Sequence, residues 1–342
     1  MKILISTGIY PPDIGGPAQY ARNLYETWKN DGHEVKVCAF RWERAFPPII
    51  RHLLFLTKVW RKGWNADLIL VLDTWSAAVP TMLACKFMRK KYIVRTGGDF
   101  LWESYVERTG DMVLFREFYN KAKKNFTAKE RLVRYLTQKV LKNAKKIIFS
   151  TDWQKKIFES EYCLDKSKNV IVENYYGKRV DPLNPENRAF VGGTRFLKWK
   201  NLDILKEAFS IAEEKIDREK IFDSIELDTG VAYYDNFFEK IRRSYAVILV
   251  SLGDISPNMI MDSIRAGVPF ICTQETGIYE RIKDIAIFVN PSDPKQIAEK
   301  IIWLSNPQNR LLQAQKVQSF DFVHTWNQIS KEILNVSNNV KK

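Results

Sequence analysis

Short apolar runs alternate with longer amphipathic stretches along the first half of the chain. The apolar runs are typical of buried strands, and most of the stretches between them have helical periodicity. The runs predicted as strands are Ile3–Ile5, Glu34–Phe40, Leu68–Leu72, Tyr92–Arg95 and Lys146–Ser150. Strands that alternate with helices indicate a parallel, doubly wound sheet.

The same rhythm restarts in the second half. The further runs predicted as strands are Arg188–Val191, Ser224–Leu227, Ala246–Val250, Pro269–Thr273 and Ala286–Val289. Residues 178–187 hold two prolines among polar residues, which is typical of a linker. We therefore expect an α/β protein of two Rossmann-like domains, residues 1–180 and 188–321, that face each other across a cleft. A helix over about 322–342 is expected to pack back on the first domain.

Charge adds a constraint on partners. Lys and Arg total 54 against 40 Asp and Glu, a net charge of +14. This excess points to nucleic acid, an anionic membrane face or a phosphorylated substrate. The four cysteines lack zinc spacing, so we expect reduced, buried thiols in a cytoplasmic protein. The N-terminus does not resemble a signal peptide, and no apolar run reaches the roughly 20 residues of a membrane-spanning helix.

A glycine pair follows the first predicted strand. Gly15 and Gly16 lie in the loop 11–18, just before a helical pattern. Glycines let a backbone approach a ligand closely, and a helix N-terminus attracts phosphate. The alternative is a plain strand-to-helix turn. The loop is not a G-x-G-x-x-G sequence, which disfavours a dinucleotide cofactor.

The second predicted domain opens with a basic loop between a strand and a helix. Arg195 and Lys200 lie in it, and both could meet one diphosphate through charge-assisted hydrogen bonds. The alternative is a solvated basic loop. Further along, Asp254 follows a predicted strand and Asp262 lies on the next helix, with seven residues between them. Both carboxylates can project toward one pocket, although Asp262 could also be a helix cap or a surface charge.

Together these motifs resemble the large retaining glycosyltransferase family four, which has the GT-B fold. Asp254 and Asp262 match two family Glu that have seven residues between them and precede Gly-x-Pro, here 267–269. Arg195 and Lys200 resemble the family's Arg and Lys. Gly15 and Gly16 resemble its N-terminal glycine loop, and residues 275–280 resemble the Gly-rich stretch that closes the pattern. The resemblance spans residue 3 to about 330.

The resemblance implies transfer of a sugar from a nucleotide-sugar donor to a glycan or lipid-linked acceptor, as in polysaccharide biosynthesis, with retention of configuration. Asp262 would bind the ribose, and Asp254 would face the donor sugar beside backbone N–H groups at Ser256–Asn258. Arg195 and Lys200 would stabilise the leaving diphosphate, where charge develops. This basic pair would replace a metal, so no metal or other cofactor is expected. Each family Glu is Asp here, and its side chain is one methylene shorter. The resemblance therefore does not determine how far each carboxylate reaches toward the sugar and the ribose.

Asp99 is the remaining catalytic candidate. It follows a predicted strand of the first domain, where related enzymes often place a His that touches the donor sugar. The three histidines of this chain lie elsewhere. The alternative is a loop Asp that satisfies its own backbone. In retaining family members the acceptor attacks from the leaving-group side and a phosphate oxygen takes the proton, which would explain the lack of a His base.

Two segments carry a basic and partly apolar surface. Residues 116–146 hold eleven Lys or Arg against two Glu, and Leu132, Leu136 and Val140 predict an amphipathic helix with a basic outer face. Residues 48–64 mix apolar, aromatic and basic residues, which suits an interfacial helix. We therefore expect a peripheral position on the anionic cytoplasmic membrane face. The alternative is a core-packed helix with solvated charges.

Two rival functions stay open. A nucleic-acid-binding protein would explain the charge, but it leaves Asp254 and Asp262 unexplained, and no nucleic-acid module is present. We therefore expect no nucleic-acid partner. A sugar epimerase or a phosphorylase could use the same fold. The base, the sugar and the acceptor are not determined by these motifs.

Overall fold

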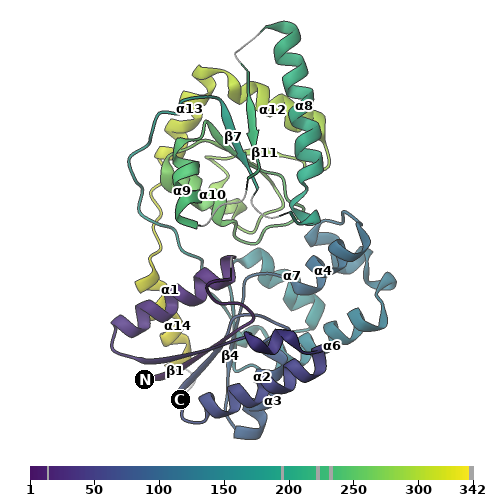
Figure 1. The fold of residues 1–342 in the computed structure, drawn as a ribbon, viewed down its shortest axis with the longest axis vertical. Helices are drawn as coiled ribbons and strands as arrows, with labels where there is room; N and C mark the ends of the chain where they lie inside the picture. The colour runs from purple at the N-terminus through teal and green to yellow at the C-terminus, as the bar shows by residue number, and fades with distance from the viewer. Residues whose placement is uncertain (14, 194–195, 221–223, 231–233, 339–342) are drawn as a thin grey trace. The chain divides into compact units, whose positions relative to one another are not determined.

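The computed structural model describes residues 1–13, 15–193, 196–220, 224–230 and 234–338 (Figure 1). The chain forms two compact units. Unit 1 consists of Met1–Trp102, Ala122–Tyr175 and His324–Lys342, and unit 2 of Glu103–Lys121 and Tyr176–Val323. The segment Glu103–Lys121 therefore groups with the second unit, although it lies inside the range predicted for the first domain.

Unit 1 contains a six-stranded parallel sheet of order β2-β1-β3-β4-β5-β6. Its strands are β1 (Lys2–Thr7), β2 (Glu34–Ala39), β3 (Leu68–Val71), β4 (Ile93–Thr96), β5 (Lys146–Phe149) and β6 (Asn169–Ile171). Its helices are α1 (Gly16–Asn30), η1 (Trp42–Ala45), α2 (Pro48–Gly63), α3 (Ala78–Met88), η3 (Lys123–Asn125), α6 (Ala128–Asn143), α7 (Asp152–Tyr162), η4 (Lys166–Lys168) and α14 (Trp326–Asn338). Helix α4 (Phe100–Thr109) begins in unit 1 and continues in unit 2.

Helices cover the unit 1 sheet because alternate strand residues are apolar on both faces. Ile3 and Ile5 point to one face, where α1 and α14 lie side by side (Figure 1). Ile329 and Ile333 of α14 are fully buried in that core. Leu4 points to the other face, where α2 and α3 contact β1. Both faces are therefore buried, as expected for a parallel sheet.

Unit 2 contains a five-stranded parallel sheet of order β11-β10-β9-β7-β8. Its strands are β7 (Ala189–Gly192), β8 (Glu226–Asp228), β9 (Ala246–Leu249), β10 (Phe270–Thr273) and β11 (Ile287–Val289). Its helices are η2 (Phe115–Glu117), α5 (Phe118–Lys121), η5 (Lys198–Lys200), α8 (Leu202–Glu219), α9 (Tyr234–Arg243), α10 (Asn258–Ala266), α11 (Tyr279–Ile282), α12 (Pro294–Ser305) and α13 (Pro307–Gln318). The two Rossmann-like sheets confirm the predicted α/β fold class.

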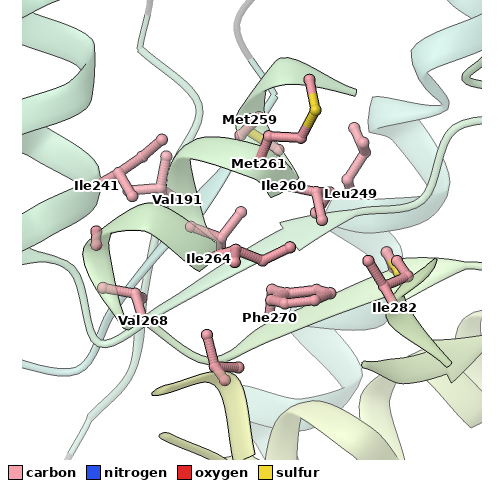
Figure 2. Packing of buried hydrophobic residues seen from close by; sticks show 14 of the residues in the cluster. Val191, Ile241, Leu249, Met259, Ile260, Met261, Ile264, Val268, Phe270 and Ile282 are labelled. Carbon is pink, nitrogen blue, oxygen red and sulfur yellow. The ribbon is translucent and has the colours of Figure 1, made fainter. Parts of the chain in front are cut away.

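The helix that carries Asp262 is packed deep in unit 2. Figure 2 shows Ile260 and Ile264 of α10 beside Leu249 of β9 and Phe270 of β10. Helices α8 and α12 lie side by side over the other face of the sheet (Figure 1). Because α10 is held on the sheet by apolar side chains, its N-terminal turn has a fixed place next to the loop after β9.

Two sequence expectations need correction. Strand β6 was not predicted, since it is a three-residue strand with an exposed residue and little hydrophobic signal. The apolar stripe of α6 was placed correctly only in part. Val140 of the predicted stripe is buried, but Leu132 is 53% exposed, and Val133 and Thr137 are buried instead. The helix has two neighbouring apolar rows, and the sequence alone does not show which one faces the core.

Candidate functional site

The strand order of unit 2 creates a point where the chain reverses its direction of winding. The chain passes from β7 to β8 at one edge and then returns to β9 on the other side of β7. In such sheets ligands bind at this switch point, outside the carboxyl ends of the two strands. The loop that follows β7 carries Lys200, and the loop that follows β9 carries Asp254. The two loops predicted to meet the donor therefore meet at the switch point.

Lys200 and Asp254 form an ion pair between these loops. Each side chain is 14% exposed, so the pair is largely shielded from water. The Lys200 Nζ also lies 4.4 Å from the centroid of the Trp199 ring, a cation–π distance. The N–H of Leu252 donates to the carbonyl of Trp199 at 2.9 Å. A cation is thus held in a defined place at the carboxyl edge of the sheet.

Asn201 fixes the loop that carries Lys200. Its backbone has φ of 61°, in the left-handed region that Asn tolerates better than most residues. Its side-chain amide donates to the carbonyls of Val250 and Pro291, at 3.1 and 2.6 Å. The loop after β7 is therefore tied to the ends of β9 and β11, and α8 begins directly after it.

Helix α10 opens next to Asp254. Ser256 precedes the helix and its hydroxyl lies 3.7 Å from the Met261 sulfur, and Asn258 is the first helical residue. The N-cap residue Pro257 makes no side-chain capping bond. A helix N-terminus of this kind presents backbone N–H groups and a partial positive charge to an anion. The placement of Ser256 and Asn258 thus suits a phosphate or a sugar hydroxyl.

Asp262 lies one turn further along α10 and is 6% exposed. Carboxylates are seldom buried to this degree unless they are paired. Asp262 is two positions from both Ile260 and Ile264, so it lies on a different side of the helix from these core residues. The sequence predicted its place on the helix. Its role as a ribose ligand stays a prediction.

Glu275 belongs to the same cluster, although the sequence motifs indicated no role for it of its own. Its carbonyl accepts the N–H of Asp254 at 2.9 Å, and the N–H of Gly277 donates to the carbonyl of Asp254 at 3.0 Å. The carboxylate of Glu275 is held by Arg116, with 2.7 Å between Arg116 Nε and Glu275 Oε2. Arg116 lies 159 residues from Glu275 in the chain, so no local sequence pattern predicts this ion pair.

Arg195, the other predicted diphosphate ligand, lies outside the described residues. Gly193, two residues earlier, has φ of 71°, and a Cβ there would lie 2.8 Å from the Leu202 side chain. Only glycine fits this position without strain. Within the described ranges, no cluster of three or more His, Cys, Asp or Glu side chains is arranged to hold a metal ion.

The predicted glycine loop belongs to unit 1. Gly15 has φ of 148°, and its carbonyl accepts the N–H groups of Ala18 and Gln19, both at 3.1 Å, so it is the N-cap of α1. Gly16 is the first residue of that helix. Arg44 holds the loop through two hydrogen bonds to Asp13, at 2.8 and 2.6 Å. The predicted opening of a helix by the glycine pair is thus observed.

Asp99 has a structural contact in unit 1. The side chain is 3% exposed, and its Oδ1 accepts the N–H groups of Leu101 and Trp102, at 2.9 and 3.1 Å. These are capping bonds at the start of α4, and such bonds to the local backbone were the alternative to a catalytic role for Asp99. A catalytic role for Asp99 stays a prediction.

Known structures of the same architecture clarify the fold. No family model matches the sequence, and no curated protein matches it. Among solved structures, HepE of Anabaena in complex with UDP aligns with a TM-score of 0.66 and 13% identity, over 99% of this chain and 100% of that chain. Sucrose-phosphate synthase from Thermosynechococcus elongatus aligns with a TM-score of 0.72 and 12% identity, over 99% and 98%.

WaaG, a glycosyltransferase involved in lipopolysaccharide biosynthesis, aligns with a TM-score of 0.66 and 12% identity, over 98% of this chain and 99% of that chain. The chain has the GT-B fold. The fold prediction is thereby confirmed. At these identities the likeness establishes the fold alone, so membership of family four within the GT-B fold stays a prediction.

Proposed function

We propose that this protein is a glycosyltransferase that moves a sugar from a nucleotide-sugar donor to a glycan or lipid-linked acceptor. One observation carries the proposal: Lys200 and Asp254 form a shielded pair at the switch point of unit 2, beside the uncapped N-terminus of α10. A cation, a helix N-terminus and a carboxylate together suit a diphosphate that is joined to a hydroxyl-rich sugar.

Each part of the donor has a proposed partner. Lys200 and Arg195 bind the diphosphate, and each charge-assisted bond contributes about 1.5–3 kcal/mol. Asp262 accepts the ribose hydroxyls. Asp254 faces the donor sugar together with the N-terminal turn of α10 at Ser256–Asn258. HepE has been crystallised with UDP and with UDP-glucose, which makes UDP-glucose the first donor to try.

The reaction needs stabilisation of the negative charge that develops on the departing diphosphate. Lys200 and Arg195 are proposed to provide it, so the proposed mechanism requires no metal ion or other cofactor. We propose retention of configuration: the acceptor hydroxyl attacks from the side of the leaving group, and a phosphate oxygen of that group accepts its proton. The acceptor is proposed to bind to unit 1. The backbone of Gly15 and Gly16 is proposed to face the donor phosphates, and Asp99 is proposed to act on the donor sugar.

Mass spectrometry of the nucleotides retained by the purified protein tests the donor class directly. We expect a nucleoside diphosphate or its sugar, and we expect UDP-glucose to be consumed in excess EDTA when an acceptor is supplied. Consumption without acceptor and with an altered sugar would favour an epimerase. Activity lost in EDTA and restored by magnesium or manganese would contradict the metal-free mechanism.

An exposed stripe on α2 supports a membrane-proximal acceptor. Ile49, Leu53, Trp60 and Trp64 recur at helical spacing, and their exposed fractions lie between 45% and 77%. The opposite side of α2 is buried through Phe55, so the helix is apolar on two sides. Arg51, Arg61 and Lys62 lie on the same helix. In the described part of the chain, no helix combines the length and apolar character needed to cross a bilayer.

We propose that this stripe and the basic residues of α6 bind an anionic lipid surface. Each Lys or Arg near such a surface contributes about 1 kcal/mol. Sedimentation with anionic vesicles should show binding that salt weakens, and neutral vesicles should not bind. Replacing Trp60 and Trp64 by Ser should reduce this binding, whereas Trp303→Ser, at a Trp that is 41% exposed in unit 2, should not. Tight binding to DNA but not to vesicles would favour the nucleic-acid rival.

A further inference from the structure

The segment Glu103–Lys121, here called the 103–121 segment, contacts each of three loops at the carboxyl edge of the unit 2 sheet. Glu107 Oε1 accepts the N–H of Lys198 at 2.7 Å, in the loop after β7. The N–H of Phe115 donates to the carbonyl of Leu252 at 3.1 Å, in the loop after β9. Arg116 pairs with Glu275, in the loop after β10. These are the loops that carry Lys200, Asp254 and Glu275.

The contact between Arg116 and Glu275 is the strongest of the three in chemical terms. The guanidinium meets both carboxylate oxygens, through Nε and Nη2, in the two-pronged geometry that Arg favours. The Glu275 side chain is 4% exposed, whereas that of Arg116 is 49% exposed. A carboxylate so deeply buried depends on its partner, so Arg116 determines where the Glu275 side chain lies.

Glu275 in turn fixes the backbone of Asp254. Its carbonyl accepts the Asp254 N–H at 2.9 Å, and two residues later Gly277 donates to the Asp254 carbonyl at 3.0 Å. Asp254 and Thr276 accordingly form an isolated parallel bridge. The loop after β10 therefore binds both the backbone N–H and the backbone carbonyl of Asp254, the residue that pairs with Lys200.

We propose that Arg116 is a positioning residue for Asp254, acting through Glu275. The proposal deepens the function proposed above, in which Asp254 faces the donor sugar and Lys200 the diphosphate. It follows that loss of Arg116 disturbs recognition of the sugar more than recognition of the nucleoside diphosphate. A merely structural Arg116 would instead alter the whole of unit 2 or affect both ligands alike.

Hydrogen exchange of the ligand-free protein is the first test, because it is independent of the donor. In Arg116→Ala the amides of Asp254 and Gly277 should exchange at least about fivefold faster, and Arg116→Lys should fall between this variant and the wild type, since Lys keeps the charge but not the paired donors. Arg218→Ala is the matched control, because it removes the same charge from an exposed position at the end of α8. Unchanged exchange at these amides, or faster exchange throughout unit 2, would overturn the proposal.

Calorimetry with UDP and UDP-glucose is the second test. In Arg116→Ala the affinity for UDP-glucose should fall about tenfold relative to the wild type, and that for UDP should stay within about threefold. Glu275→Gln should behave similarly, and the double variant should be no worse than either single one, because both act through one contact. Equal losses for both ligands would overturn the role toward the sugar. If the wild type binds neither UDP nor UDP-glucose, the uridine donor is wrong, and the exchange experiment alone decides the role of Arg116.

Discussion

The ammonium of Lys200 is bound to the carboxylate of Asp254, although the two residues belong to loops that follow different strands of the unit 2 sheet. Both side chains are mostly shielded from solvent. The cation proposed to hold the diphosphate and the carboxylate proposed to face the sugar are thus in direct contact. A donor diphosphate that binds there must either share Lys200 with Asp254 or displace the Asp254 carboxylate from it.

Loss of the cation should weaken diphosphate binding. We expect Lys200→Ala to raise the dissociation constant of a nucleoside diphosphate about tenfold or more, since a charge-assisted hydrogen bond contributes about 1.5–3 kcal/mol. Arg195→Ala is expected to act in the same direction. Lys198→Ala is the matched control, because Lys198 is an exposed cation in the same loop. Calorimetry measures all three, and unchanged affinity in both Lys200→Ala and Arg195→Ala would contradict the assignment.

Loss of the carboxylate should have the opposite effect on the same ligand. Asp254→Asn removes a negative charge next to Lys200, so a nucleoside diphosphate should bind about fivefold more tightly, given a Coulomb energy of about 1 kcal/mol between charges about 4 Å apart in water. Transfer of the sugar should nevertheless fall, because Asp254 is proposed to face it. The two effects are measured by calorimetry and by donor turnover. Weaker diphosphate binding in Asp254→Asn would mean that Asp254 orders the site rather than competes for Lys200.

The role of Asp262 can be separated from its burial with a modified ligand. If its carboxylate binds the ribose, a 2′,3′-dideoxynucleotide should bind the wild type at least about tenfold less well than the normal nucleotide. Asp262→Asn should bind both nucleotides with nearly the same affinity. Circular dichroism of the variant provides the control for folding. A normal preference for the ribose hydroxyls in a folded variant would assign Asp262 a structural role.

The thiols should differ sharply in reactivity. Cys38, Cys85 and Cys272 are buried and Cys163 is exposed. Burial raises the pKa of the Cys38 thiol to about 11 and that of Cys85 to about 12, and it raises the pKa of Cys272 as well. Because only the thiolate reacts and these groups stay protonated below the raised pKa, a thiol reagent at pH 8 should label Cys163 alone. Cys163→Ser should abolish fast labelling, and denaturant should expose all the thiols.

Local patterns predicted most of the fold. Each of the ten strands predicted from apolar runs overlaps an observed strand, because parallel strands buried on both faces are continuous hydrophobic segments. The loops that carry Lys200 and Asp254 could also be predicted, since they follow such strands directly. Strand β6 could not, because its three residues are not apolar enough to stand out.

Contacts between residues far apart in the chain could not be predicted from the sequence. The contact between Arg116 and Glu275 joins residues far apart in the chain, and no sequence pattern relates the basic segment 116–146 to the stretch 275–280. Helix α6 gives an example between neighbouring residues. Leu132 and Val133 both have apolar side chains, and only packing against the rest of the unit determines that Val133 is the buried one. Which residue is buried and which residues pair depends on neighbouring elements that the sequence of one segment does not show.

The two-part make-up of unit 2 has a consequence for exchanging donor domains between related proteins. A chimera that takes residues 176–323 from one parent would take the loops after β7, β9 and β10 but leave the 103–121 segment of the other parent. The hydrogen bonds from Glu107, Phe115 and Arg116 would then depend on a foreign sequence. A chimera that preserves the donor site must therefore take the 103–121 segment and residues 176–323 from the same parent. The segment to be exchanged is thus longer than the continuous stretch that contains the second sheet.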